Sequence, residues 1–277
     1  MSSKRYSVEI TDLTFGYDKG KPILKDLNIQ LPFNKYICIL GHNGSGKSTL
    51  SKLLIGIFKA WSGTIKVSDI ELNDSNYRKI LHKVGLVFQN PDSQFIGLTA
   101  EDDIAFGLEN RNVPKALSRK IINQVSKFLN IESYLNVNSS FLSGGQKQKV
   151  AIASILALNP EIIIFDESTS MLDTWSKKEI LDVMQTLVKR ENKTVISITH
   201  DMEELLLADE IVLLKEGRVL AHTTPKKLLN DVELMKSSNL DLPFIHCLAN
   251  SLREKGVNIS RFDDEDELIK LLSQLKK

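Results

Sequence analysis

The stretch GHNGSGKSTL, residues 41–50, decides the fold. It matches the pattern G-x-x-x-x-G-K-[ST], in which a glycine-rich loop turns its backbone N–H groups inward around a polyphosphate. The apolar run YICIL precedes it at residues 36–40, and KSTLSKLLIGIF follows at 47–58 with leucines at helical spacing. Strand, glycine loop and helix in this order favour a phosphate-binding loop over a glycine-rich turn that leaves its lysine in solvent.

The helix that begins near Lys47 adds its positive N-terminal end to this loop. We expect Lys47 to reach the β- and γ-phosphates and Ser48 to hold Mg²⁺. The nucleotide-binding residues expected in the loop are Gly41, His42, Asn43, Gly44, Ser45, Gly46, Lys47, Ser48 and Thr49.

Length and composition limit the classes of function that this chain can have. The 277 residues can form one large domain plus an appendage, or two modest domains, and 36 basic against 35 acidic residues give a net charge of +1. This balance argues against bulk attraction to nucleic acid or to a membrane surface. The start of the chain has no apolar core of signal-peptide length, and no apolar run approaches the roughly 20 residues of a membrane-spanning helix. Cys38 and Cys247 do not form a disulfide framework, so we expect a cytosolic protein.

The pattern along the chain predicts an α/β fold. Alternating runs predict strands at 6–17, 23–32 and 63–72, and charged periodic segments predict helices at 76–84 and 115–135. A further helix is expected at 147–158. Short, almost continuous apolar runs at 161–167 and 194–200 are typical of buried parallel strands, and residues 211–222 predict a hairpin around Glu216 and Gly217.

The run EIIIFDE places Asp166 and Glu167 at the end of a predicted buried strand. Ligands bind at the carboxyl ends of parallel strands. We therefore expect Asp166 to hold Mg²⁺ and Glu167 to polarise the attacking water.

A second segment that could bind phosphate lies in FLSGGQKQKV, residues 141–150. Its residues are Leu142, Ser143, Gly144, Gly145 and Gln146, followed by the start of a helix. Two phosphate-binding segments in one chain could bind two nucleotides, or could clamp one nucleotide between two subunits.

The three motifs GHNGSGKST, LSGGQ and IIIFDE resemble those of the ATPase domain of ATP-binding cassette (ABC) transporters, over about residues 6–225. The resemblance implies a P-loop NTPase fold with a mixed sheet core, an antiparallel β subdomain and a helical subdomain at about 90–158. It also implies that Leu142–Gln146 face the nucleotide of a partner ATPase. Four further positions carry over from the family: Tyr17 stacks on adenine, Gln89 links Mg²⁺ to the membrane partner, Asp173 crosses the dimer, and His200 contacts the γ-phosphate.

Two stretches narrow the resemblance. Residues 90–110 and DESTSMLD at 166–173 look like the first ATPase subunit of energy-coupling factor (ECF) transporters, which import vitamins and metals. This implies a second, unlike ATPase, a transmembrane coupling subunit, a separate membrane substrate-binding subunit, no nucleic-acid partner, and a peripheral position on the cytoplasmic face of the membrane. It also implies that residues 225–277 form a small helical dimerisation domain after an ATPase domain at 1–224.

The tail shows an apolar helical set that suits such an interface: Leu242, Phe244, Ile245, Leu248 and Leu252. Two positions depart from the family. The chain has DTWSKKEI where a proline and an arginine commonly follow Asp173, and Lys149 stands where arginine is usual.

Three other interpretations remain open at this stage. The chain could be the ATPase of another importer, a soluble ABC protein that acts on nucleic acid or ribosomes, or a module that ATP switches without hydrolysis. The single P-loop and the absence of a long insertion argue against the second, and Glu167 with His200 argues against the third.

Overall fold

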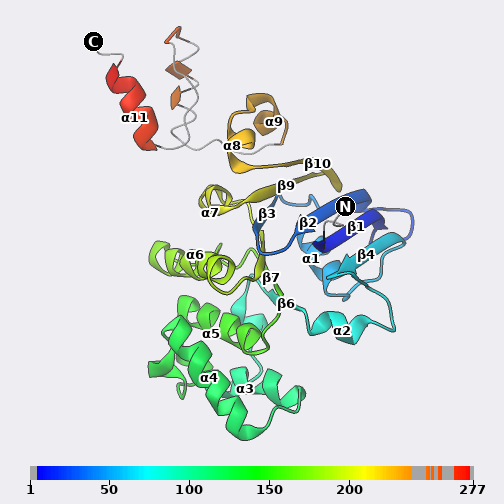
Figure 1. Cartoon of the computed structure of the whole chain (residues 1–277), viewed down its shortest axis with the longest axis vertical. Coiled ribbons are helices and arrows are strands. Elements are labelled where there is room, and N and C mark those ends of the chain that lie inside the picture. The colour runs from blue at the N-terminus through cyan, green and yellow to red at the C-terminus, as the bar shows by residue number, and fades with distance from the viewer. Residues whose placement is uncertain (1–4, 239–247, 250, 253–254, 258–264, 275–277) are drawn as a thin grey trace.

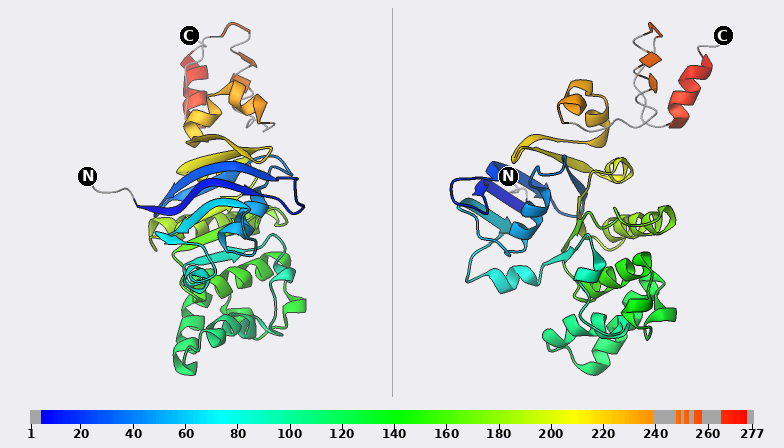
Figure 2. Two further views of the ribbon diagram at one scale, coloured as in Figure 1. Left: turned by 90° about the vertical axis from the view of Figure 1, so that its right-hand side faces the viewer. Right: turned by 180° about the vertical axis from the view of Figure 1, so that it is seen from behind.

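The computed structural model describes residues 5–238, 248–249, 251–252, 255–257 and 265–274. Two β-sheets lie face to face, with a lobe of helices at one end and α8 (Pro225–Leu229) and α9 (Val232–Ser237) at the other (Figures 1 and 2). None of the helices in these residues is long and apolar enough to cross a membrane.

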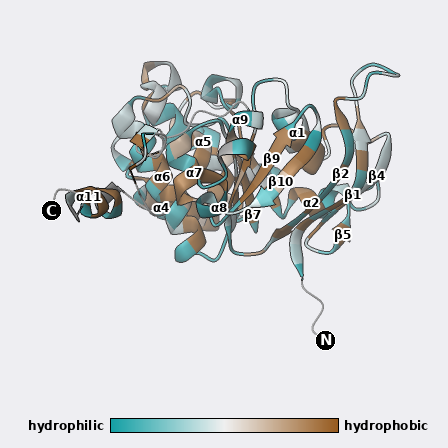
Figure 3. Ribbon diagram, turned by 90° about the horizontal axis from the view of Figure 1, so that it is seen from above, coloured by the Kyte–Doolittle hydropathy of each residue, from teal (hydrophilic) through white to brown (hydrophobic). Residues whose placement is uncertain are grey.

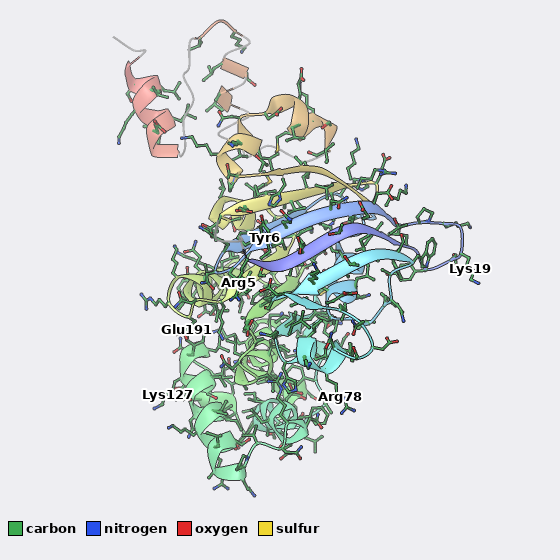
Figure 4. The ribbon with its side chains drawn as sticks, turned by 45° about the vertical axis from the view of Figure 1, so that its right-hand side comes forward. Arg5, Tyr6, Lys19, Arg78, Lys127 and Glu191 are labelled. Carbon is green, nitrogen blue, oxygen red and sulfur yellow. The ribbon has the colours of Figure 1, made fainter. Side chains whose placement is uncertain are left out.

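The first sheet is antiparallel, with strand order β2-β1-β4-β5. Its strands are β1 (Tyr6–Phe15), β2 (Leu24–Pro32), β4 (Ser62–Val67) and β5 (Ile70–Glu71). The segment expected as one strand at 63–72 is a hairpin, because Ser68 and Asp69 both adopt positive φ and reverse the chain. Lys19 marks the tip of the turn between β1 and β2 in Figure 4.

The second sheet has strand order β10-β9-β3-β8-β7-β6. Its strands are β3 (Tyr36–Leu40), β6 (Val84–Val87), β7 (Ile162–Asp166), β8 (Thr194–Ile198), β9 (Glu210–Lys215) and β10 (Arg218–Thr223). The pairs from β9 to β6 are parallel, and β10 pairs antiparallel with β9 in the predicted hairpin. The carboxyl ends of β3, β7 and β8 therefore meet at one edge of the sheet.

The second sheet separates two hydrophobic cores. Along β3, Cys38 and Leu40 face one core while Ile37 and Ile39 face the other, as the two-residue period of a strand requires. The β7 strand alternates in the same way. Burial on both faces explains why these strands are apolar throughout, and Figure 3 colours the central strands mainly as hydrophobic.

The helices pack around these sheets. The helix α1 (Lys47–Leu54) contributes to the core between the two sheets, and α2 (Tyr77–Leu81) carries the exposed Arg78 (Figure 4). The helices of the lobe are α3 (Ala100–Asn110), α4 (Lys115–Leu129) and α5 (Gly144–Ala157), with 3₁₀ turns at η1 (Pro91–Ser93), η2 (Glu132–Tyr134) and η3 (Ser139–Phe141). The helices α6 (Thr174–Lys189) and α7 (Met202–Leu207) cover the other face of the second sheet.

Several element boundaries differ from the sequence predictions. The helix expected at 76–84 spans only five residues, because β6 begins at Val84. The helix expected at 115–135 ends at Leu129, because Asn130 adopts a left-handed conformation that caps it. The sequence analysis did not predict β6, α3, α6 or α7.

The C-terminal region has two kinds of packing. Leu228, Leu229 and Met235, from α8 and α9, belong to the hydrophobic core that Cys38 and Leu40 of β3 face, here called the main core. Ala249 and Leu268 form a separate small cluster, and Leu268 lies on α11 (Glu265–Gln274). Within the apolar set expected at 242–252, Leu242, Phe244 and Ile245 lie outside the described residues, as does Cys247, while Leu248 and Leu252 are half-buried. The domain division at residue 225 stays a prediction.

A buried carboxyl group attaches α7 to the sheet. Glu204 is 1% exposed, and its two oxygens accept hydrogen bonds from the Thr169 and Ser197 hydroxyls. Burial raises the pKa of Glu204 above its ordinary value, against the lowering effect of these two hydrogen bonds.

The raised pKa predicts a pH-dependent stability. The folded chain keeps the Glu204 proton at a pH where the unfolded chain has lost it, so this contribution to stability declines as pH rises above the unfolded pKa. Glu204→Gln, which cannot ionise, should therefore gain stability relative to wild type between pH 5 and pH 8. Urea unfolding at both pH values measures this, with the exposed Glu191→Gln as control. A wild type that gains stability relative to Glu204→Gln over this range would contradict the prediction.

Candidate nucleotide-binding site

The phosphate-binding loop joins β3 to α1 and is held in one conformation by close packing. Gly46 precedes α1 with φ of 101°, and a Cβ there would lie 2.4 Å from Leu24 Cδ2. Only glycine suits both the left-handed backbone and the contact. The Ser45 amide donates to the His42 carbonyl over 3.1 Å, which closes the turn.

Lys47 points back into this loop. Its ammonium donates to the carbonyls of Gly41 (2.7 Å) and His42 (3.2 Å) and lies 4.0 Å from Glu167 Oε1. The side chain is 4% exposed, and burial lowers its pKa, partly offset by Glu167 and Asp166. A polyphosphate beside the ammonium would favour its charged form, so the geometry suits an anionic ligand.

Asp166 joins the loop helix to the end of β7. Its Oδ1 accepts from Ser48 Oγ at 2.9 Å and its Oδ2 from Ser51 Oγ at 2.8 Å. Ser48 and Asp166 were predicted together as Mg²⁺ ligands, and the structure brings them into contact. The sequence analysis missed Ser51, although its spacing of three residues from Ser48 places both hydroxyls on one face of α1.

Glu167 lies at the centre of the site. Its backbone has φ of 49°, a left-handed conformation that is strained for a non-glycine residue, and its amide donates to Ile198 O over 2.8 Å. Gln89 Nε2 donates to Glu167 Oε2 at 3.1 Å and to Ser170 Oγ at 3.3 Å. His200 Nδ1 lies 3.9 Å from Glu167 Oε1. Gln89 and His200, which follow the strands β6 and β8, therefore meet around the carboxylate of Glu167, which follows β7.

The residues fit a nucleoside triphosphate with magnesium. Ser45 Oγ is buried and has no hydrogen-bond partner in the described part of the chain, so it can donate to a phosphate oxygen. The Ser48 hydroxyl, the Asp166 carboxylate and the Gln89 amide supply the oxygen ligands that Mg²⁺ prefers. In the described residues no group of three His, Cys, Asp or Glu side chains could hold another metal ion.

Tyr17 belongs to an aromatic group beside the loop. Its hydroxyl lies 3.1 Å from Thr49 Oγ1, and its ring packs edge-on against Phe15 and Phe58 with centroids 5.4 and 5.3 Å away. The ring is 54% exposed, so one side can receive a flat base.

The LSGGQ segment forms the start of α5. Ser143 and Gln146 make a capping box, in which Gln146 Oε1 accepts from the Ser143 amide at 2.9 Å and Ser143 Oγ accepts from the Gln146 amide at 3.3 Å. Leu142 is buried, and a Cβ on Gly144 would meet no atom within 4 Å. The first turn of α5 thus leaves open space at Gly144.

Asp173 caps α6. It accepts hydrogen bonds from the amides of Trp175 and Ser176 at 3.0 Å and from the Ser176 hydroxyl at 2.6 Å. The Ser176 hydroxyl, followed by the amide bonds, holds the pKa of Asp173 below its ordinary value. Its carboxylate is therefore fixed at the start of the helix.

A glycine-rich phosphate loop, a carboxylate beside the loop serine and a second carboxylate at the next position define a P-loop NTPase site. The family profile "ABC transporter" matches residues 24–170. The dimeric ATP-binding cassette MJ0796 in a post-hydrolysis state with ADP and Pi is 30% identical, with a TM-score of 0.70 over 79% of this chain and 98% of that chain.

Three further relatives narrow the assignment. The energy-coupling factor transporter ATP-binding protein EcfA of Malacoplasma penetrans is 46% identical over 99% of this chain and 96% of that protein. EcfA1 of Mesomycoplasma hyopneumoniae strain J is 49% identical over 98% of both chains. CbiO1 of Clostridium perfringens, part of the ABC transporter complex cbiONQ, superposes with a TM-score of 0.78 at 33% identity, over 89% of this chain and 99% of that chain. The chain belongs to the ABC transporter family and, within it, to the energy-coupling factor transporter ATP-binding proteins.

Removing the Lys47 ammonium should weaken ATP binding. A charge-assisted hydrogen bond contributes about 1.5–3 kcal/mol, so Lys47→Ala should raise the Kd for ATP roughly ten- to a hundredfold. Titration with a fluorescent ATP analogue measures the Kd, and Lys52→Ala on the same helix is the matched control. An unchanged Kd would exclude this loop as the phosphate site.

Proposed function

We propose that residues 41–49, Asp166, Glu167 and His200 bind and hydrolyse ATP to energise an energy-coupling factor importer for vitamins or other micronutrients, metal ions included. The observation that carries the proposal is the contact of Asp166 with Ser48, next to Glu167, whose Oε1 lies 4.0 Å from Lys47 Nζ. The proposed phosphate cradle, metal ligands and water-activating carboxylate thereby lie next to one another.

Each residue has a role that follows from its surroundings. Lys47 and Ser45 would bind phosphate oxygens, and Tyr17 would stack on adenine. Ser48, Asp166 and Gln89 would hold Mg²⁺, which supplies charge neutralisation on the β- and γ-phosphates when bound. Glu167 would take a proton from the attacking water, and the Gln89 hydrogen bond fixes its side chain for that step. His200, 56% exposed beside Glu167, would contact the γ-phosphate.

The chain functions with another ATPase and with transmembrane components. We infer that the signature residues Leu142–Gln146 and Asp173 act on the partner's nucleotide. The exposed first turn of α5 supports this, since its capping box leaves Gly144 in open space. ATP binding would close the two subunits and hydrolysis would open them, as in any ligand-biased two-state switch.

The finer assembly is also a proposal. The second ATPase is unlike this chain, Gln89 lies toward the transmembrane coupling subunit, and a separate membrane protein binds the imported substrate. The chain would then lie peripherally on the cytoplasmic face of the membrane. Identification of the proteins that co-purify with it from membranes tests this assembly.

Glu167→Gln should separate binding from hydrolysis. Glutamine keeps the shape and can accept the Gln89 hydrogen bond, but it cannot act as a base. Turnover by the assembled complex should fall by about 10²–10⁴ while ATP still binds. A phosphate-release assay measures this in a complex whose partner site is disabled. Glu161→Gln is the control, because Glu161 immediately precedes the first residue of the same strand β7. Near wild-type turnover in Glu167→Gln would refute the role of Glu167 as the general base.

Two truncations should locate the joining element between the ATPases. Deleting 225–277 also removes Leu228, Leu229 and Met235 from the main core, whereas deleting 239–277 leaves α8 and α9 in place. If the tail joins the subunits, the shorter deletion should already weaken the heterodimer. Light scattering measures this, and a heterodimer that survives it unchanged would exclude the tail beyond Ser238 as the joining element.

A further inference from the structure

The start of α5 and the start of α6 form one packed unit. A Cβ on Gly145 would lie 2.3 Å from Ser176 Oγ, so the two helices touch at these residues. The Ser176 hydroxyl in turn donates to Asp173. Deeper in the helices, Lys149 of α5 pairs with Glu179 of α6 at 2.8 Å. The signature segment and Asp173 therefore cannot move independently of each other.

Lys177 connects this unit to a different part of the site. Its ammonium contacts Asp201 Oδ2 at 2.5 Å and Glu203 Oε2 at 2.7 Å, both at the start of α7. The Lys177 side chain is 17% exposed, and that of Asp201 is 30% exposed. Burial opposes the charge of Lys177, but its hydrogen bonds to the two carboxylates outweigh burial and raise its pKa.

Asp201 holds the segment that carries His200. Its Oδ1 accepts from the Glu203 amide at 2.7 Å and its own amide donates to Thr199 Oγ1 at 3.0 Å. His200 itself is more than half exposed, and its Nδ1 lies 3.9 Å from Glu167 Oε1. Its position therefore depends on the residues on either side of it, and Asp201 is one of these.

We propose that Lys177 is a positioning residue that couples the surface offered to the partner's nucleotide, at the signature segment and Asp173, to His200 at this chain's own nucleotide. The proposal rests on the function proposed above. A displacement of Asp173 moves the first turn of α6, because the Lys177 amide donates to the Asp173 carbonyl over 2.9 Å. The Lys177 ion pairs then transmit that displacement to Asp201 and to its neighbour His200. Lys177 belongs to the stretch DTWSKKEI, which departs from the family pattern, and it supplies the positive charge of this connection.

The test uses the assembled complex with the partner's own nucleotide site disabled. Lys177→Ala and Asp201→Asn should each lower kcat about tenfold, equivalent to about 1.4 kcal/mol of transition-state stabilisation, with the Kd for ATP unchanged within about twofold. Asparagine can keep the cap on the Glu203 amide, so Asp201→Asn removes the charge and the acceptor oxygen that face Lys177. The double variant should lose no more than Lys177→Ala alone, because Lys177→Ala already removes the ion pair with Asp201.

Two variants separate positioning from a structural role. Lys177→Arg keeps the cation and should retain kcat within about twofold, while Lys178→Ala removes an exposed charge from the same helix and should leave kcat unchanged. Equal kcat values for Lys177→Ala and Lys178→Ala, or multiplicative losses in the double variant, would overturn the inference. A wild-type complex that does not hydrolyse ATP would instead refute the proposed function.

Discussion

The hydrogen bonds of Asp166 to Ser48 and Ser51 are the constraint on which the site depends. They join the helix that follows the phosphate loop to the strand that ends at Glu167. Because β7 pairs with β8 and β8 with β3, the same contact fixes the loop relative to the segment that carries His200. Removal of a buried partner from such a pair leaves an unsatisfied polar group, which costs about 1–3 kcal/mol.

The sequence predicted the parts of the site that local pattern determines. Glycine spacing identified the loop around Lys47, and an apolar run that ends in polar residues identified Asp166 and Glu167, whereas His200 was assigned from the family resemblance. Strand β6 and helix α6 were missed although the sequence held their signal, since Ile180, Met184 and Leu187 repeat at helical spacing. The contacts of Glu204 with Thr169 and Ser197 carry no periodic sequence pattern, so only the structure reveals them.

The chain presents two chemically different surfaces on one scaffold. The first, around Lys47 and Glu167, contains the charged groups that we propose bind and cleave a triphosphate. The second surface, at the first turns of α5 and α6, contains backbone amides, Ser143 and Asp173, the residue that caps α6. Neither is a complete site for a nucleotide that must be released after each turnover. In the proposed function, the division of these two surfaces between subunits would let hydrolysis control association.

The central claim is that this chain contributes to two nucleotides, one through its P-loop and one through its signature segment. Vanadate trapped with ADP occupies the γ-phosphate position, and ultraviolet irradiation then cleaves the adjacent backbone. In a complex with an intact partner, Lys47→Ala in this chain should abolish cleavage within residues 41–49 and retain cleavage within 142–146. Loss of both cleavages together would contradict the claim, because it would mean that both segments serve the same nucleotide.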